Sequence, residues 1–445
     1  MTRLPALRIP RCLLDPSANL PPADAEGLVA VCLEHQGGRI TALKPAAAGA
    51  EPFGEACLAS GAGFPDARGQ APALAITPPV DPHVHLDKAF SAAAFPNPAG
   101  TMAGALEANL RELEVRRPEQ VLERGERALQ LAWRHGCRAL RSHVDSLGPA
   151  APSAWEALQE LRRRWADRLE LQLVALAPLR HWASPEGQVQ ARRVAADGGL
   201  LGSVVGGPFG LPSFDRDLLD ALLQLADRLG CAIDLHIDES DTHPARGVRN
   251  LVDRLERRPC GVPITCSHAS SLALLGDGQL ARLADRLAAA GVAVVALPTT
   301  NLWLLGKREG HTPFRRPQAP LRQLQAAGVV VAVGSDNVQD PWYPGGAFDP
   351  VELLRLVPLL SHQLPWQRRG LVPFTTAAAR LLDLPWDGVL REGSPADLLV
   401  LGCSGWGELL QRAPQRRVLR GGRWLPPPEP APSNPWLDGL GPPPC

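Results

Sequence analysis

The sequence lacks both an excess of charge of one sign and any long apolar run. Lysine plus arginine and aspartate plus glutamate each number 46, whereas a nucleic-acid-binding protein normally carries a basic excess or patch. No stretch of about 18 apolar residues is present, so we expect no transmembrane helix. The first residues are interrupted by Pro5, Pro10 and Pro16 and show no secretory signal. These absences favour a cytoplasmic protein with no nucleic-acid or membrane partner.

Paired cysteines and a glycine-rich phosphate loop are also missing. The nine cysteines are scattered from Cys12 to Cys445 without a CxxC pair, which argues against a disulfide framework and favours buried thiols in a reducing compartment. A doubly wound sheet usually shows a glycine-rich turn after its first strand, and none follows the first apolar run here. This absence disfavours an open, doubly wound sheet.

The middle of the chain alternates short apolar runs with longer helical segments. Segments with apolar residues three or four positions apart are typical of amphipathic helices, and they separate runs typical of strands. Because strands that alternate with helices pair in parallel, eight such units can close into a barrel. The sequence therefore predicts the α/β class, with a (β/α)₈ TIM barrel over residues 76–384. The eight expected strands are residues 76–81, 138–145, 169–176, 201–206, 232–238, 263–268, 292–297 and 329–336.

The two ends of the chain do not fit the barrel pattern. Residues 27–43 are typical of two short strands around Gly37 and Gly38, and residues 397–402 and 417–424 are typical of strands near the other end. We expect residues 1–75 and 385–425 to meet in a small β-sandwich module. Within it, residues 46–75 are rich in Ala, Gly and Pro and are predicted to form a surface loop. Residues 426–445 form a proline-rich tail.

Histidine and acidic residues gather where the predicted strands end. In a barrel, the carboxyl ends of all strands converge on one face, and that face carries the active site. We therefore expect residues that are far apart in the sequence to surround one centre. His83 and His85 follow the first strand, His143 ends the second, His236 the fifth and His268 the sixth, and Asp336 ends the eighth.

Four of these residues have the chemistry of a metal site. The HxH spacing of His83 and His85 puts both imidazoles on one side of an extended strand. His236 and Asp336 would complete a set of three nitrogens and one oxygen, with a position left for water. A divalent metal ion held there lowers the pKa of its water to about 7, which makes hydroxide available at neutral pH.

Two further residues fit proton transfer at this centre. Glu239 lies three residues beyond His236, where it can shuttle a proton without ligating the metal, and His268 can orient the attacking hydroxide. Interpretations without a metal or a catalytic role also remain open for several of these residues. An HxH pair also occurs on strands that bind no metal, His143 is equally typical of a hydrogen-bonded structural residue, and Asp336 is also typical of a turn.

Several segments resemble one family. Residues 82–88 (PHVHLDK) resemble the first metal motif of the amidohydrolase superfamily. The resemblance narrows to the cytosine deaminases in residues 142–145 (SHVD), 234–239 (DLHIDE), 267–268 (SH), 334–337 (GSDN) and 340–344 (DPWYP). Residues 393–398 (GSPADL) are similar to the segment where that family's chain returns to its β-sandwich. The likeness covers nearly the whole chain except residues 46–75 and the tail.

The resemblance implies one divalent metal ion, Fe²⁺ or Zn²⁺, and assigns roles to six residues. The fourth predicted strand ends in Gly206 and Gly207, whereas two-metal relatives carry a bridging lysine there, so a single ion is expected. The implied metal ligands are His83, His85, His236 and Asp336, with Glu239 as the proton shuttle and with His268 and Asp336 positioning the hydroxide.

Two departures from the family pattern concern the substrate. Leu179 stands where cytosine deaminases carry a glutamine that binds the pyrimidine's amide edge, and Asn337 stands where a second aspartate is frequent. A buried polar edge without a partner costs about 1–3 kcal/mol, so cytosine itself is disfavoured. Trp342 is predicted either to wall the substrate ring or to pack at the barrel rim, and His143 is the remaining substrate-side candidate.

The sequence therefore predicts a metal-dependent hydrolase that deaminates a small amino-substituted nitrogen heterocycle by attack of metal-bound hydroxide. One alternative keeps the site but hydrolyses a cyclic or N-substituted amide. Another is a catalytically silent relative that binds ligands. Cytosine deaminases often assemble into oligomers, although no interface signature is visible in this sequence, so a homo-oligomer is an open alternative to a monomer.

Overall fold

The computed structural model of the chain describes residues 1–47, 72–207, 216–367 and 369–426. The barrel is one sheet of eight parallel strands in the order β13-β12-β11-β10-β9-β8-β7-β6. A bridge between Val84 and Asp336 joins the last strand's end to the first strand and closes the ring. The strands are β6 (Val80–Val84), β7 (Ala139–Asp145), β8 (Glu170–Leu176), β9 (Leu200–Val205), β10 (Ile233–Ile237), β11 (Ile264–His268), β12 (Ala293–Ala296) and β13 (Val331–Val333).

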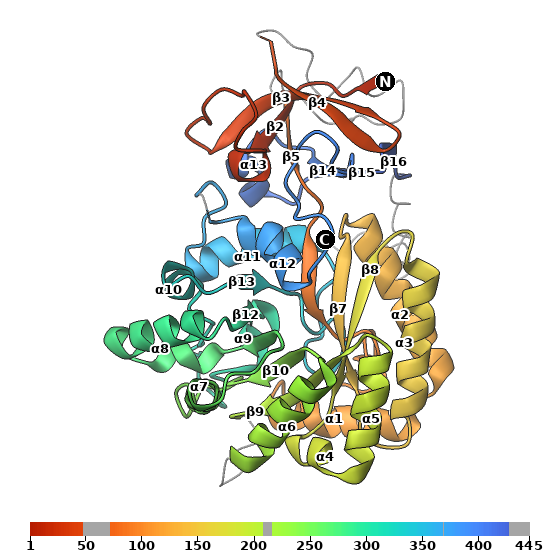
Figure 1. The fold of residues 1–445 in the computed structure, drawn as a ribbon, viewed down its shortest axis with the longest axis vertical. Coiled ribbons are helices and arrows are strands. Elements are labelled where there is room, and N and C mark those ends of the chain that lie inside the picture. The colour runs from red at the N-terminus through yellow and green to blue at the C-terminus, as the bar shows by residue number, and fades with distance from the viewer. Residues whose placement is uncertain (48–71, 208–215, 368, 427–445) are drawn as a thin grey trace, which may run out of the picture.

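Helices surround the barrel (Figure 1). α2 shows why they form, since it starts with Pro118 at its first position and buries Val121 and Leu129 on one face. Gly136, at φ 94°, then turns the chain toward β7. The helices are α1 (Met102–Val115), α2 (Pro118–Arg134), α3 (Ala151–Trp165), α4 (Leu179–Ala183), α5 (Pro185–Ala196), α6 (Arg216–Leu229), α7 (Arg246–Arg257), α8 (Asp277–Ala289), α9 (Pro298–Leu304), α10 (Leu321–Ala326), α11 (Pro350–Ser361), α12 (Thr376–Leu381) and α13 (Trp406–Gln411).

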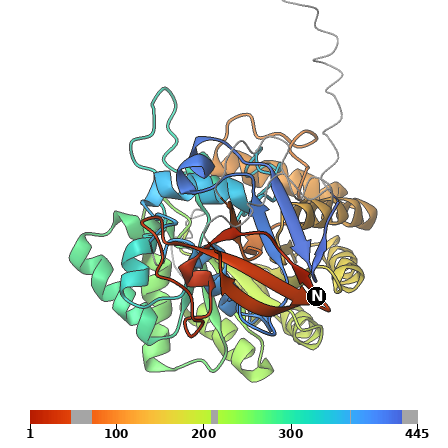
Figure 2. The same cartoon turned by 90° about the horizontal axis from the view of Figure 1, so that it is seen from above.

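Both ends of the chain form a second, mixed sheet at one end of the molecule (Figure 1). Figure 2 shows its N-terminal strands in red beside its C-terminal strands in blue. The two groups of strands are joined where β5 pairs with β14. Its order is β1-β3-β2-β5-β14-β15-β16, with β4 paired to β3. The strands are β1 (Thr2–Arg3), β2 (Leu7–Pro10), β3 (Leu28–Gln36), β4 (Arg39–Pro45), β5 (Ala73–Ile76), β14 (Leu398–Leu401), β15 (Arg416–Arg420) and β16 (Arg423–Trp424).

The terminal sheet rests on the amino end of the barrel strands. Arg420 of β15 donates to the carbonyl of Gly136 at 2.9 Å, just before β7 begins, and Gly136 also lies against Leu399 of β14. The carboxyl ends of the barrel strands, which carry the histidines, are therefore left uncovered by this sheet.

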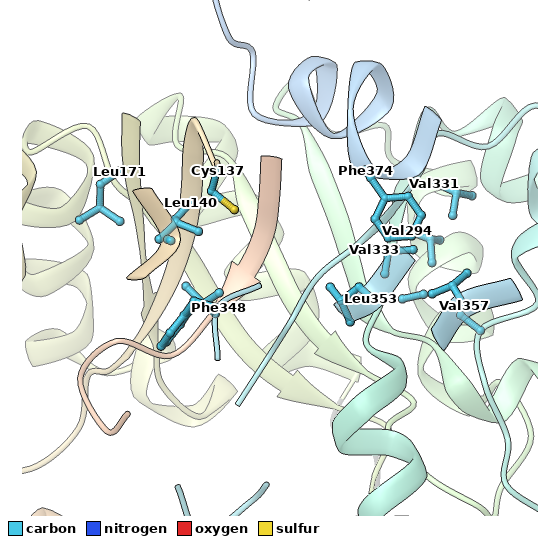
Figure 3. Close-up of a cluster of buried hydrophobic side chains, with 14 of the residues drawn as sticks. Cys137, Leu140, Leu171, Val294, Val331, Val333, Phe348, Leu353, Val357 and Phe374 are labelled. Atoms are coloured by element: carbon cyan, nitrogen blue, oxygen red, sulfur yellow. The ribbon is translucent and has the colours of Figure 1, made fainter. Parts of the chain in front are cut away.

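A continuous apolar core fills the barrel wall and continues into the terminal sheet. Figure 3 shows one part of it, where Val331 and Val333 of β13 lie beside Phe374 and beside Leu353 and Val357 of α11. β13 has three residues and so forms few hydrogen bonds with its neighbours. The packing of these side chains therefore holds it in place.

The predicted fold class is confirmed: an α/β barrel carries a β module built from both ends of the chain. The domain boundaries themselves stay a prediction. No helix among the described residues has both the length and the apolar character needed to cross a membrane. The seven cysteines in this part of the chain are free thiols.

The expected first strand, residues 76–81, was wrong in its bounds. Ile76 ends β5 of the terminal sheet, and the first barrel strand starts at Val80. Pro78 and Pro79 separate the two, because proline has no N–H to donate to a ladder. His83 consequently lies inside β6 rather than after it.

Other expectations about the elements also need correction. Residues 73–75, expected in a loop, belong to β5, while residues 48–71 and the tail from residue 427 lie outside the described residues. The eighth strand was expected to reach Asp336, but β13 ends at Val333 and Asp336 joins β6 through its own bridge. The pattern also missed α1, α4, α9, α11, α12 and α13.

Candidate metal centre and active site

The structure brings together the histidines and the aspartate expected at one centre. Oδ1 of Asp336 lies 3.3 Å from Nε2 of His85 and 3.6 Å from Nε2 of His83. Nε2 of His236 lies 3.3 Å from Nε2 of His85. All four side chains are buried. They come from β6, β10 and the segment after β13, so the barrel's closure creates the cluster.

These distances fit a bound divalent metal ion. With metal–ligand bonds of about 2.1 Å, neighbouring ligand atoms of a tetrahedral site lie about 3.4 Å apart. Nε2 of His83 and both carboxylate oxygens of Asp336 are buried and have no hydrogen-bond partner, a costly arrangement for polar atoms unless a ligand satisfies them. The donor set of imidazole nitrogens and one carboxylate is the one that zinc and iron prefer.

A hydrogen-bond chain orients His83 for this role. The hydroxyl of Ser267 donates to Asp234 at 2.7 Å and lies 2.9 Å from Nδ1 of His83. Because the hydroxyl proton of Ser267 is donated to Asp234, the hydroxyl oxygen accepts a hydrogen bond from Nδ1–H of His83. The lone pair of His83 is then left on Nε2, on the side of Asp336. Nη1 of Arg141 donates to Oδ2 of Asp234 at 2.9 Å and so fixes this carboxylate.

Burial favours the neutral form of two imidazoles of this cluster, those of His83 and His236. It lowers the pKa of His83 and of His236 well below the ordinary value of 6.5, and the neighbouring His143 acts in the same direction. Burial alone would raise the pKa of Asp336, but His268 and His85 hold it below its usual value. Neutral imidazoles and an ionised carboxylate are the forms that bind metal.

The two expected proton-transfer residues lie beside this cluster. Oε1 of Glu239 is 3.4 Å from Nδ1 of His268, and Glu239, His268 and Asp336 can place one polar atom each within 4.8 Å of one another. Burial, reinforced by Asp336, raises the pKa of Glu239 well above 4.5, and burial lowers the pKa of His268 to about 4. Burial therefore favours the protonated form of Glu239 and the neutral form of His268 at neighbouring positions.

Two of these residues have an unusual backbone. His268 has φ 69° and Asp336 has φ 64°, a left-handed conformation that costs a residue with a side chain about 1 kcal/mol or more. Strained backbone is concentrated where geometry is imposed for function. Here it turns the side chain of His268 at the end of β11 and that of Asp336 in the segment after β13.

His143 packs against the rings of the cluster. Its ring stacks on that of His83 with centroids 3.7 Å apart, and its Nε2 is 3.4 Å from Asp234. It is fully buried in β7. These contacts match the structural interpretation left open above, while its role toward a substrate stays a prediction.

The other three substrate-side candidates lie at loops on the carboxyl side of the strands. Asn337 donates to Asp340 at 2.7 Å, and Asp340 also accepts from the backbone N–H of Trp342 at 2.9 Å. Leu179 is the first residue of α4, after β8, and packs partly buried against the core. Asp340 therefore fixes the loop that carries two of the three candidates.

The sequence interpretation missed four residues that the structure places around the centre. Asp234, Ser267 and Arg141 form the chain beneath His83, and Asn301 on α9 contacts both Glu239 and His268. Asp234 lies two residues before His236 and therefore shares its side of β10. That spacing was the signal available in the sequence, whereas the contacts of Ser267 depend on its pairing with His236 across β10 and β11.

Comparisons with known proteins agree with this fold. The sequence profile of the amidohydrolase family matches residues 98–425. A pterin deaminase of Rhizobium rhizogenes is 35% identical over 344 residues, which cover 76% of this chain and 77% of that protein. An N-isopropylammelide isopropyl amidohydrolase of Pseudomonas sp. is 26% identical over 77% of this chain and 84% of its own length.

A solved structure covers almost the whole chain. The 5-methylcytosine deaminase of Klebsiella pneumoniae, liganded with phosphonocytosine, superposes with a TM-score of 0.77 and 25% identity, over 97% of this chain and 99% of that one. The matched region includes both the barrel and the terminal sheet. The resemblance inferred from the motifs is confirmed, and the chain belongs to the amidohydrolase family.

Proposed function

We propose that this protein is a metal-dependent hydrolase that removes the amino group from an amino-substituted nitrogen heterocycle. The observation that carries the proposal is the placement of Glu239 and His268 beside the buried cluster of histidines and Asp336. A hydrolytic deaminase needs a source of hydroxide and a group that moves a proton to and from the ring. Both requirements have residues at this one centre.

The substrate class that we propose is a pterin-like fused aminopyrimidine ring. The Rhizobium relative, 35% identical, is a pterin deaminase, and the Klebsiella structure is that of a 5-methylcytosine deaminase. Leu179 follows β8 where the resemblance calls for a glutamine, which argues against cytosine. An apolar side chain there is compatible with a larger ring that does not present a pyrimidine's amide edge at that point.

The residues divide the chemistry among them. A divalent ion, Fe²⁺ or Zn²⁺, held by His83, His85, His236 and Asp336 would lower the pKa of water to about 7 and so supply hydroxide. Glu239 delivers a proton to the ring nitrogen next to the carbon that bears the amino group, which makes that carbon more electrophilic. His268 donates a hydrogen bond to the attacking oxygen. Glu239, now ionised, takes the proton of the added hydroxyl group and gives it to the amino group, which leaves as ammonia while the carbonyl forms.

A second function uses the same residues on a different bond. The Pseudomonas relative is an N-isopropylammelide isopropyl amidohydrolase, so removal of an alkylamine from an N-substituted ring is the main competitor. Asn337, whose amide donates to Asp340, stands next to Asp336 where cytosine deaminases frequently carry a second aspartate. This difference does not by itself select which edge of a substrate ring is bound. A silent binding relative is disfavoured by the complete set of buried ionisable groups at the centre.

Ammonia release tests the proposal. The purified protein, loaded with Fe²⁺ or Zn²⁺, is assayed against pterins, aminopyrimidines, aminotriazines and their N-alkyl derivatives. Release of ammonia from a pterin, lost on chelation and restored by metal, supports deamination. Release of alkylamine without ammonia would favour the second function, and binding of metal without any turnover would contradict both.

A further inference from the structure

Asn301 contacts both residues assigned to proton transfer. It lies on α9, directly after β12, and its side chain is completely buried. Its Nδ2 is 3.1 Å from Nδ1 of His268 and 3.4 Å from Oε1 of Glu239. One amide group therefore joins the general acid–base residue to the histidine beside it.

The hydrogens of this amide determine where His268 carries its proton. An amide NH₂ has two hydrogens and no lone pair to offer, and a neutral imidazole has one N–H and one lone pair. When Nδ2 of Asn301 donates to both neighbours, Nδ1 of His268 must be the acceptor. The proton of His268 is then on Nε2, which is buried and has no partner of its own.

The opposite arrangement holds for His83 at the same centre. Nδ1 of His83 faces the hydroxyl of Ser267, which donates to Asp234 and so accepts from the imidazole. His83 is thereby left with a lone pair on Nε2, as a metal ligand requires. Two neighbouring histidines thus receive opposite tautomers from the groups behind them.

We propose that Asn301 is a positioning residue that holds His268 in the Nε2–H tautomer, so that His268 is a hydrogen-bond donor and not a metal ligand. The tautomer follows from the orientation of the Asn301 amide, with Nδ2 toward both neighbours, while its use toward the attacking oxygen rests on the proposed deamination. His83, His236 and His268 can each place one ring nitrogen within 4.8 Å of the others, so His268 is also a candidate metal ligand. Asn301 is the group that settles which of the two roles it takes.

The test reads the tautomer directly. The zinc-loaded full chain is labelled with ¹⁵N-histidine, and the His268 signals are assigned by their loss in His268→Asn. We expect an Nε2-bound proton on His268. Asn301→Asp replaces the donor amide with an acceptor of the same shape, so the proton should move to Nδ1. Asn250→Asp makes the same change on α7, where Asn250 donates to the carbonyl of Arg246, and should leave the His268 signals unchanged.

Kinetics gives the second reading. Loss of one preorganised donor typically lowers kcat by about 10²–10³-fold, so Asn301→Asp should reduce kcat by that factor while KM changes by less than about 3-fold. Asn301→Ala is the fallback if the aspartate variant does not fold, and it should leave His268 as a mixture of tautomers. An Nδ1–H proton in the unsubstituted protein, or an Nε2–H proton retained in both variants, would overturn the proposal. Because the NMR reading needs no turnover, it stands or falls apart from the deaminase assignment.

Discussion

Oδ1 of Asp336 lies 3.3 Å from Nε2 of His85 across the seam where the barrel closes. His85 directly follows β6, the first barrel strand, and Asp336 follows β13, the last. The backbone contribution at this seam is small, because Val84 and Asp336 form a single bridge and the N–H of Asp336 donates to the carbonyl of His83 at 2.8 Å. A metal ion held by His85 and Asp336 would therefore link the first strand of the barrel to the last.

Metal removal is accordingly expected to lower the stability of the protein as well as its activity. An ion at about 1,000 times its Kd stabilises the folded state by ~4 kcal/mol. Calorimetry with and without a chelator should show a fall in Tm of several degrees that is reversed by added metal. Asp336→Asn should have the lower Tm from the start and should not respond to the chelator. An unchanged Tm in the chelated parent protein would contradict this account.

Glu239→Gln is expected to abolish most turnover while leaving the metal in place. The glutamine keeps the shape of the side chain but cannot exchange a proton, and general acid–base catalysis contributes about 10²–10⁴-fold. Steady-state kinetics and metal analysis on the same sample separate the two effects. Glu119→Gln, on the exposed first turn of α2, is the matched control. Full activity in the Glu239 variant, or loss of its metal, would show that Glu239 is not the proton shuttle.

Ser267→Ala should weaken metal binding without removing any ligand. The variant deletes the acceptor for Nδ1–H of His83 and leaves Asp234 without the hydroxyl that now donates to it at 2.7 Å. Loss of such a supporting contact lowers metal affinity by about 10–100-fold, which competition with a chromophoric chelator measures. Ser361→Ala controls for the substitution, because the hydroxyl of Ser361 donates to the carbonyl of Val357 on α11. Equal affinity in the two variants would mean that Ser267 does not orient His83.

The sequence was sufficient to predict the barrel and the centre because both leave short-range signals. Parallel strands buried on both faces are seen as continuous apolar runs, and a barrel directs all their carboxyl ends to one face. His83, His236 and Asp336 could therefore be grouped before their distances were known. The bounds of the first and last strands were wrong, because prolines interrupt the apolar run at the first strand and because β13, with three residues, is shorter than the apolar run that contains it.

The supporting contacts could not be predicted in the same way. Ser267 reaches His83 from another strand, and Asn301 reaches Glu239 and His268 from a helix after β12. Such contacts depend on strand register and on helix placement, which are set by packing over the whole core. A polar run after an apolar strand, as at residues 299–301, is the weak signal that marks Asn301 in the sequence.

An ion network beside the site gives a prediction for acid stability. Asp145, at the end of β7, accepts from Lys88 at 2.8 Å and from Arg116 at 3.1 Å. Burial alone would raise the pKa of Asp145, but Lys88 and Arg116 hold it well below its usual 3.8. Since the folded pKa lies below the unfolded one, ionised Asp145 stabilises the fold above about pH 4, and this contribution is lost as the pH falls toward the folded pKa.

Asp145→Asn should therefore destabilise the metal-free protein by ~3 kcal/mol at pH 7, because it leaves buried Lys88 and Arg116 short of one negative charge. Urea unfolding measured from pH 7 down to pH 3 should show the difference from the parent shrinking below about pH 4. The control is Asp277→Asn, at an exposed position at the start of α8, which should unfold like the parent throughout. A difference that stays constant, or grows, as the pH falls would mean that Asp145 acts through its shape and not through its charge.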